Sequence, residues 1–130
     1  MKYCYPAVFT KEENGYSVDF PDIENCFTCG ETLEEAVEMA ADALAMMLTD
    51  REDRKQQMPT PTPLSQVETA GDAMASLVLA DTAEYRRRTS NRAVKKTLTI
   101  PEWLNTAAEA ANVNFSQTLQ EALTAKLGLA

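Results

Sequence analysis

Four short segments in the first 80 residues are rich in aromatic, branched or alternating apolar residues, which is typical of β-strands. They are residues 2–10, 16–20, 26–30 and 75–80. Asn14-Gly15 follows a charged turn between the first two segments and is a strong hairpin signal. The pattern predicts a small sheet that begins with a hairpin.

A helical stripe of apolar residues follows the third segment. Its members recur three or four positions apart: Leu33, Val37, Ala40, Ala41, Leu44, Met47 and Leu48. Thr32 stands where an N-cap is needed, and Glu35 three residues later completes a capping box. The order strand, strand, strand, helix, strand predicts an α+β fold.

Prolines separate this helix from the fourth strand. Pro59, Pro61 and Pro63 cannot continue a helix and predict an extended connector. Residues 81–88 are expected to form a short helical turn capped by Asp81 or Thr82. The polar, basic stretch that follows is the best domain boundary, which divides the chain into residues 1–88 and 89–130.

The last third of the chain reads as one alternating strand followed by two amphipathic helices. One face of the strand carries Val94, Leu98 and Ile100, and the other carries Lys95, Thr97 and Thr99. Pro101 ends the strand and suits the first helical position. Asn114 is a good N-cap for the second helix, and Gln117 gives a loose capping box. A unit of this size has too little core to fold alone, so we expect it to pair with a copy of itself.

This unit resembles the ribbon-helix-helix family of DNA-binding domains in its strand, the proline after it, its small-residue first helix and the polar turn. The resemblance implies that two chains form an antiparallel ribbon, whose outer side chains read the major groove. It places these residues against DNA: Arg92, Lys95, Thr97, Thr99, Asn114, Phe115 and Ser116. It places these in the dimer core: Leu98, Ile100, Trp103, Leu104, Leu119 and Leu123. A buried strand with two packing helices and no nucleic acid remains an alternative, and a helix-turn-helix is a weaker one.

Charge is unevenly distributed along the chain. Residues 1–70 carry 14 acidic and 5 basic side chains, whereas residues 71–130 carry 6 acidic and 7 basic ones. Between Arg86 and Lys96 there are six basic residues and no acidic one. The two halves are therefore expected to have different electrostatic partners.

The N-terminal pattern resembles the HicB antitoxin family. The resemblance rests on Gly15-Tyr16, Phe20-Pro21-Asp22, residues 26–30 and residues 32–36. It implies a partial ribonuclease-H-like domain that binds and blocks HicA, a small RNA-cleaving toxin. Joined to a ribbon-helix-helix unit, it implies a repressor that binds operator DNA of its own operon. Complementary charge would favour an acidic domain on a basic toxin, and Asp19, Asp22 and Glu24 are the candidate toxin contacts.

No catalytic constellation is visible in the sequence. The chain has no histidine, and its first strand has no acidic residue from Met1 to Thr10. Cys26 and Cys29 have the spacing of redox and zinc motifs, but only Cys4 could join them. We therefore expect structural cysteines, no metal, no cofactor and no enzymatic activity; a residual nuclease is the least favoured reading.

The sequence thus favours a cytoplasmic antitoxin and autorepressor. Its expected partners are a HicA-type toxin, operator DNA and a second copy of the chain, with assembly into a tetramer left open. No apolar run reaches membrane-spanning length. The alternative is a stand-alone ribbon-helix-helix regulator whose N-terminal domain oligomerises or senses a ligand.

Overall fold

A computed structural model describes residues 1–129 and divides the chain into two compact units. The first runs from Met1 to Arg92, and the second begins at Ala93. The predicted boundary, after residue 88, and the division after Arg92 both lie in the polar, basic stretch around the end of a short helix at Thr89.

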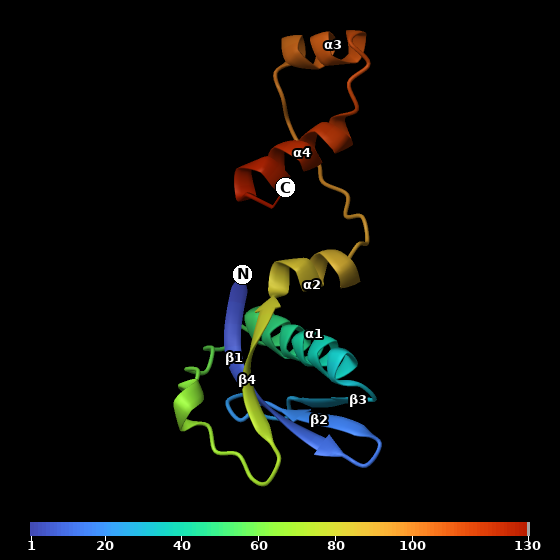
Figure 1. The fold of residues 1–130 in the computed structure, drawn as a ribbon. Helices are drawn as coiled ribbons and strands as arrows, with labels where there is room; N and C mark the ends of the chain where they lie inside the picture. Colours follow the sequence, from blue (N-terminus) through green and yellow to red (C-terminus); the bar gives the residue numbers. More distant parts are fainter. Residues whose placement is uncertain (130) are drawn as a thin grey trace. The chain divides into compact units, whose positions relative to one another are not determined.

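The first unit is a four-stranded antiparallel sheet with a long helix against it (Figure 1). Its strands are β1 (Lys2–Glu12), β2 (Gly15–Asp19), β3 (Phe27–Gly30) and β4 (Met74–Asp81). They lie in the order β3-β2-β1-β4, so β3 and β4 form the two edges. β1 pairs with β2 through Phe9 and Val18, and with β4 through Tyr5 and Val78. The predicted four strands and the α+β class are confirmed.

Helix α1 (Leu33–Asp53) covers one face of the sheet (Figure 1). The Thr32 hydroxyl accepts a hydrogen bond from the Glu35 amide at 3.1 Å, as the predicted cap requires. Alternate residues of β1 point toward the helix and are buried: Tyr5, Ala7 and Phe9. The helix contributes its own buried stripe: Ala36, Ala40, Leu44, Ala45 and Leu48. The unit therefore has a closed apolar core.

The backbone is closely packed at two glycines where β2 and β3 meet the start of α1. Gly15 opens β2 with a φ of +147°, and a Cβ there would lie 2.3 Å from the Gly30 carbonyl oxygen. A Cβ on Gly30 would lie 2.5 Å from the Ala36 amide nitrogen. Glycine is required at both positions, because a Cβ would collide with the neighbouring backbone. This requirement accounts for the glycine of the predicted Asn14-Gly15 hairpin.

Two further pieces complete the first unit. A short 3₁₀ helix, Leu64–Gln66, interrupts the connector between α1 and β4. Helix α2 (Thr82–Thr89) follows β4 directly, and the Asp81 carboxylate caps it by accepting from the amides of Ala83 and Glu84. Asp81, rather than Thr82, is the cap.

The second unit contains helices α3 (Glu102–Ala110) and α4 (Phe115–Leu127). The Asn114 side chain accepts from the Gln117 amide at 3.1 Å, so the predicted N-cap of α4 is confirmed. Pro101 precedes α3 as its cap residue instead of occupying its first position. Gly128 ends α4 in a left-handed conformation, with φ of 69°.

Residues 94–100 were expected to form a strand, but they have no regular secondary structure in the single chain. A strand is defined by hydrogen bonds to a neighbouring strand, and this segment has no neighbour within residues 1–129. The expected neighbour was the same segment of a second copy, which one chain does not supply.

Candidate functional site

The second unit has an apolar surface with no core beneath it. Neither α3 nor α4 contains a buried residue. Most of the predicted dimer-core side chains are exposed: Leu98, Ile100, Trp103, Leu104 and Leu123, with Leu119 half-buried. Trp103 exposes 72% of its surface. Such a density of exposed apolar side chains marks an interaction site.

A hollow of about 510 Å³ lies among these residues. Its apolar lining comes from the irregular segment and from α4: Leu98, Ile100, Phe115, Leu119 and Ala122. Lys96, Leu98 and Ile100 line it, whereas Lys95, Thr97 and Thr99 do not. The even and odd positions of the segment therefore differ, as the alternation in sequence predicts.

The predicted DNA contacts fall into two groups. Arg92, Lys95, Thr97 and Thr99 are exposed in the irregular segment, where nothing in the single chain orders them into a flat face. Asn114 caps α4, and Phe115 and Ser116 line the apolar hollow. Phe115 thus lies with the residues predicted for the dimer core, although it was assigned to the DNA contacts.

The run of basic residues before this unit is partly neutralised inside the first unit. Arg86 of α2 lies 2.9 Å from Asp53 and 3.1 Å from Glu52, both on α1. Arg88 lies 2.7 Å from Asp42 of α1. These two arginines hold α2 against α1, so fewer bases than the sequence run suggests are free for another partner.

Glu52 is the centre of a polar network that the sequence did not reveal. Its carboxylate accepts from the Tyr3 hydroxyl at 2.8 Å, the Thr82 hydroxyl at 2.9 Å and the Arg86 guanidinium at 3.1 Å. Burial alone would raise the pKa of Glu52, but these hydrogen bonds lower it below its ordinary value. Burial and the bond to Glu52 raise the pKa of Tyr3 to about 12. The network joins β1, α1 and α2.

The three acidic residues predicted to contact a toxin do not act as one group. Asp22 accepts hydrogen bonds from the amide of Thr62, at 2.9 Å, and from its hydroxyl. Those bonds tie the proline-rich connector to the loop after β2. Asp19 and Glu24 are exposed, Asp19 at the end of β2 and Glu24 in the loop. Asp22 is therefore occupied by a structural contact.

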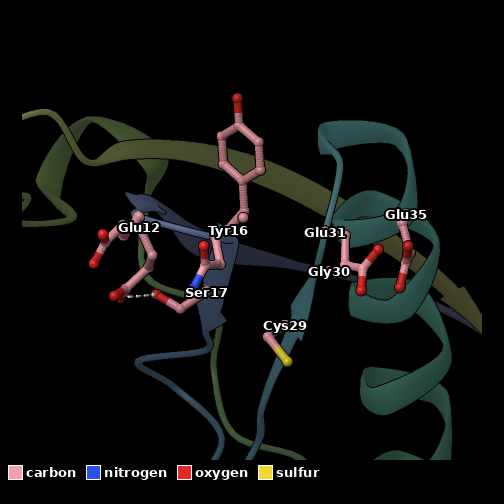
Figure 2. Close-up of a pocket in the computed structure, with 10 residues that line it drawn as sticks. Glu12, Tyr16, Ser17, Cys29, Gly30, Glu31 and Glu35 are labelled. Atoms are coloured by element: carbon pink, nitrogen blue, oxygen red, sulfur yellow. Dashed lines mark hydrogen bonds between the residues drawn. The ribbon is translucent and has the colours of Figure 1, made fainter.

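A second acidic surface lies at the other end of the sheet, around an open hollow of about 630 Å³. Figure 2 shows Glu12 on one side of it and Glu31 and Glu35 on the other. Ser17 donates a hydrogen bond to Glu12 at 3.0 Å, drawn as the dashed line. Cys29 and Tyr16 also line the hollow. Glu12 belongs to β1 and is distant in sequence from Glu31 and Glu35, so sequence reasoning did not bring it together with them.

The cysteines are free thiols in the structure. Cys26 is buried, while Cys4 and Cys29 are exposed. Burial first, and the charge of Asp19 second, raise the pKa of the Cys26 thiol to about 11, which disfavours a reactive thiolate. Within residues 1–129, no group of three or more potential ligands is arranged to hold a metal ion. None of the helices described is long and apolar enough to cross a membrane.

Comparison with known proteins gives matches over nearly the whole chain. Residues 5–124 match the model of a family described as the HicB-like antitoxin of a bacterial toxin–antitoxin system. The chain is 32% identical to antitoxin HicB 2 of Photorhabdus laumondii, over 93% of this chain and 88% of the relative. It is 40% identical to antitoxin HicB of Escherichia coli, over 47% of this chain and 45% of that one.

Solved structures agree with these matches. A chain of a toxin–antitoxin complex from Streptococcus pneumoniae superimposes with a TM-score of 0.64 at 30% identity, covering 97% of this chain and 99% of that one. The crystal structure of antitoxin HicB3 gives a TM-score of 0.53 at 28% identity, covering 95% and 97%. The similarity extends through both units.

Proposed function

Because the chain belongs to the HicB-like antitoxin family of bacterial toxin–antitoxin systems, we propose that it neutralises a HicA-type, mRNA-cleaving toxin and represses its own operon. The first unit binds the toxin, and the second binds operator DNA as a homodimer. In this proposal the first unit has a partial ribonuclease-H-like fold, and the second is a ribbon-helix-helix. The protein acts by binding, without catalysis.

The observation that carries the second half of this proposal is the apolar surface without a core. A soluble chain that leaves Leu98, Trp103 and Leu123 exposed has reason to bury them against a partner. Pairing of two copies of residues 94–100 would bury the face of Leu98 and Ile100. It would leave the opposite face, with Lys95, Thr97 and Thr99, as the outer surface of a ribbon.

An ordered ribbon would supply what DNA recognition requires. Threonine hydroxyls bond base edges, threonine methyls contact thymine, and lysine reaches guanine acceptors. The free amides at the start of α4 suit a phosphate, with Asn114 as the cap. Phe115 and Ser116 would flank that phosphate from the edge of the hollow.

Toxin binding is supported by charge in the first unit. A toxin that grips RNA needs a basic surface, and complementary charge speeds encounter. Asp19 and Glu24 remain candidate contacts because both are exposed, whereas Asp22 acts indirectly by fixing the loop to Thr62. The glutamates of the open hollow offer a second acidic surface for the same partner.

The proposal is tested by two assays on the full chain. The protein is expected to stop RNA cleavage by the toxin encoded beside it and to bind DNA from its own promoter. Neutralisation without promoter binding would contradict the assignment of the second unit. Promoter binding without neutralisation would instead favour a stand-alone regulator.

A further inference from the structure

Helix α2 is held on the first unit in different ways at its two ends. It follows β4 and lies beside α1 (Figure 1). At its start Thr82 is buried and donates to Glu52 at 2.9 Å, and Tyr85 packs partly buried against the apolar core. Beyond Tyr85, the hydrogen bonds and ion pairs that join α2 to α1 in the described part of the chain come from Arg86 and Arg88. The far end of α2 is therefore held through two guanidinium groups.

These two arginines are held unequally. The Arg86 guanidinium meets two carboxylates of α1 and also donates to the Thr49 carbonyl oxygen at 3.4 Å. Arg88 meets one carboxylate, that of Asp42, and lies 5.6 Å from the centre of the Tyr85 ring. The side chains of the Arg88–Asp42 pair are 57% and 48% exposed. Such a pair contributes little to stability, because water solvates both charges when it opens. Arg86 thus fixes the far end of α2, whereas Arg88 is free to change partner.

We propose that Arg88 is a further contact for the phosphate backbone of DNA, and that Asp42 withholds it by competing for the same guanidinium. A guanidinium bonds phosphate oxygens through the same N–H groups that bond a carboxylate, so Arg88 fits either partner. When a phosphate replaces Asp42, one ion pair is exchanged for another. The inference rests on the proposed DNA binding by the second unit, which it extends to α2.

The position of Arg88 in the sequence ties it to the proposed DNA contacts of the second unit. It precedes Arg92 by four residues and Lys95 by seven, and no acidic residue lies between them. Residues 90–101 contain no helix or strand that would fix this spacing. Seven residues of extended chain span at most about 25 Å, so the chain cannot carry Arg88 farther than that from Lys95. A phosphate near the DNA that Lys95 contacts is therefore within its range.

The sign of the charge selects DNA over the other proposed partner. Arg86, Arg87 and Arg88 are consecutive bases, which attract a polyanion and repel a basic, RNA-binding toxin. Asp42 acts in the opposite sense, because its carboxylate repels phosphate once Arg88 has left it. The Arg88–Asp42 pair therefore lowers the sequence-independent part of the DNA affinity and leaves the base contacts of the second unit unchanged.

The test removes the competing carboxylate with the isosteric change Asp42→Asn in the full chain. Random-sequence and operator duplexes are titrated across a salt series, and circular dichroism checks that each variant is folded. Asp42→Asn is expected to bind both duplexes more tightly, and by the same factor. It should also steepen the log–log dependence of affinity on salt by up to about 0.9, which is the counterion release of one phosphate contact.

Glu38→Gln is the matched control for the loss of one negative charge. Glu38 lies one turn before Asp42 on α1, is exposed, and takes part in no ion pair within residues 1–129. Its replacement relieves the general repulsion of DNA by α1 but frees no arginine. The gain in affinity should therefore be smaller than that of Asp42→Asn, and the salt dependence should stay that of the wild type.

Arg88→Ala separates the withheld contact from general electrostatics. Added to Asp42→Asn, it should cancel the gain in affinity and in salt dependence, whereas in the wild type or with Glu38→Gln it should cost less. An equal loss in the wild-type and Asp42→Asn backgrounds, or a gain from Asp42→Asn no larger than that from Glu38→Gln, would overturn the inference. Operator binding by the wild type would in that case leave the proposed function intact. A wild-type chain that bound neither duplex would contradict both.

Discussion

The two units of this chain differ in where their apolar side chains lie. In the first, a sheet and a helix enclose a core in which Ala7, Leu44 and Leu48 are fully buried. In the second, α3 and α4 have no buried residue, and the largest apolar side chain, Trp103, lies mostly in solvent. A single copy therefore encloses an apolar core in its first unit and leaves the apolar side chains of its second unit exposed. Stability of the first should depend on its own packing, and stability of the second on a partner copy.

The largest expected effect is a loss of self-association that is confined to the second unit. Leu98→Lys should abolish its self-association and all operator binding, because pairing would bury an unpaired charge. Trp103 is the only tryptophan of the chain, so its fluorescence reports this unit. On dilution, wild-type emission should shift toward that of Leu98→Lys, while toxin neutralisation remains. If the Leu98→Lys variant still bound operator DNA, the assignment of Leu98 to the buried face of residues 94–100 would be contradicted.

Next in size is a change confined to the first unit. Leu44→Ala removes a fully buried side chain from α1 and should lower the free energy of unfolding by about 2–5 kcal/mol. Met46→Ala, on the exposed side of the same helix, is the control and should change it by less than about 0.5 kcal/mol. Denaturation followed by circular dichroism measures both. Trp103 fluorescence should keep its concentration dependence in either variant; an altered dependence would show that the units are not independent.

A smaller effect separates specific from general DNA contacts in the second unit. Thr97→Ala should cost about 1–3 kcal/mol at the operator by loss of base contacts, and should narrow the difference from random DNA. Arg92→Ala should weaken both DNAs alike and reduce the salt dependence by about one phosphate contact. Titrations of operator and scrambled duplexes across a salt series distinguish them. Equal losses on both duplexes for Thr97→Ala would exclude base readout at that position.

The smallest effect concerns pH and the Glu52 network. A carboxyl whose pKa is lowered by folding stabilises the protein above its ordinary pKa of 4.5, and that stabilisation is lost as pH falls through the lowered value. The stability difference between wild type and Glu52→Gln should thus be constant above pH 4.5 and shrink below it. Denaturant titrations across this range measure the difference. A gap that persisted unchanged in acid would mean that Glu52 contributes no charge-dependent stability.

Sequence pattern predicted what is local. The caps at Thr32 and Asn114 were predicted, and Asp81 was one of two candidates for the third cap. Each cap depends on a residue two or three positions away, and all three hydrogen bonds are present. The alternation of apolar and polar residues also predicted that Leu98 and Ile100 differ in their surroundings from Thr97 and Thr99. Only the first two line the apolar hollow, although no strand forms in one copy. No strand forms there because residues 94–100 have no neighbouring strand among the described residues of one copy.

Long-range polar contacts could not be predicted. Asp22 meets Thr62 and Glu52 meets Thr82 across 40 and 30 residues, and no periodicity marks either pair. Asp22 therefore looked like a free acid, and Arg86 and Arg88 looked like free bases. In the fold each of these charged side chains contacts a complementary group of the same unit. The number of charged residues in the sequence therefore overstates the number that are free to bind a partner.

The most direct test of the two-unit account is a fragment of residues 1–92 assayed against both partners. It contains the closed core and α2, held by Arg86 and Arg88, but lacks α3 and α4. The account predicts that the folded fragment inhibits RNA cleavage by the toxin and binds no operator DNA at any salt concentration tested. Operator binding by the fragment, or failure of the folded fragment to inhibit the toxin, would contradict it.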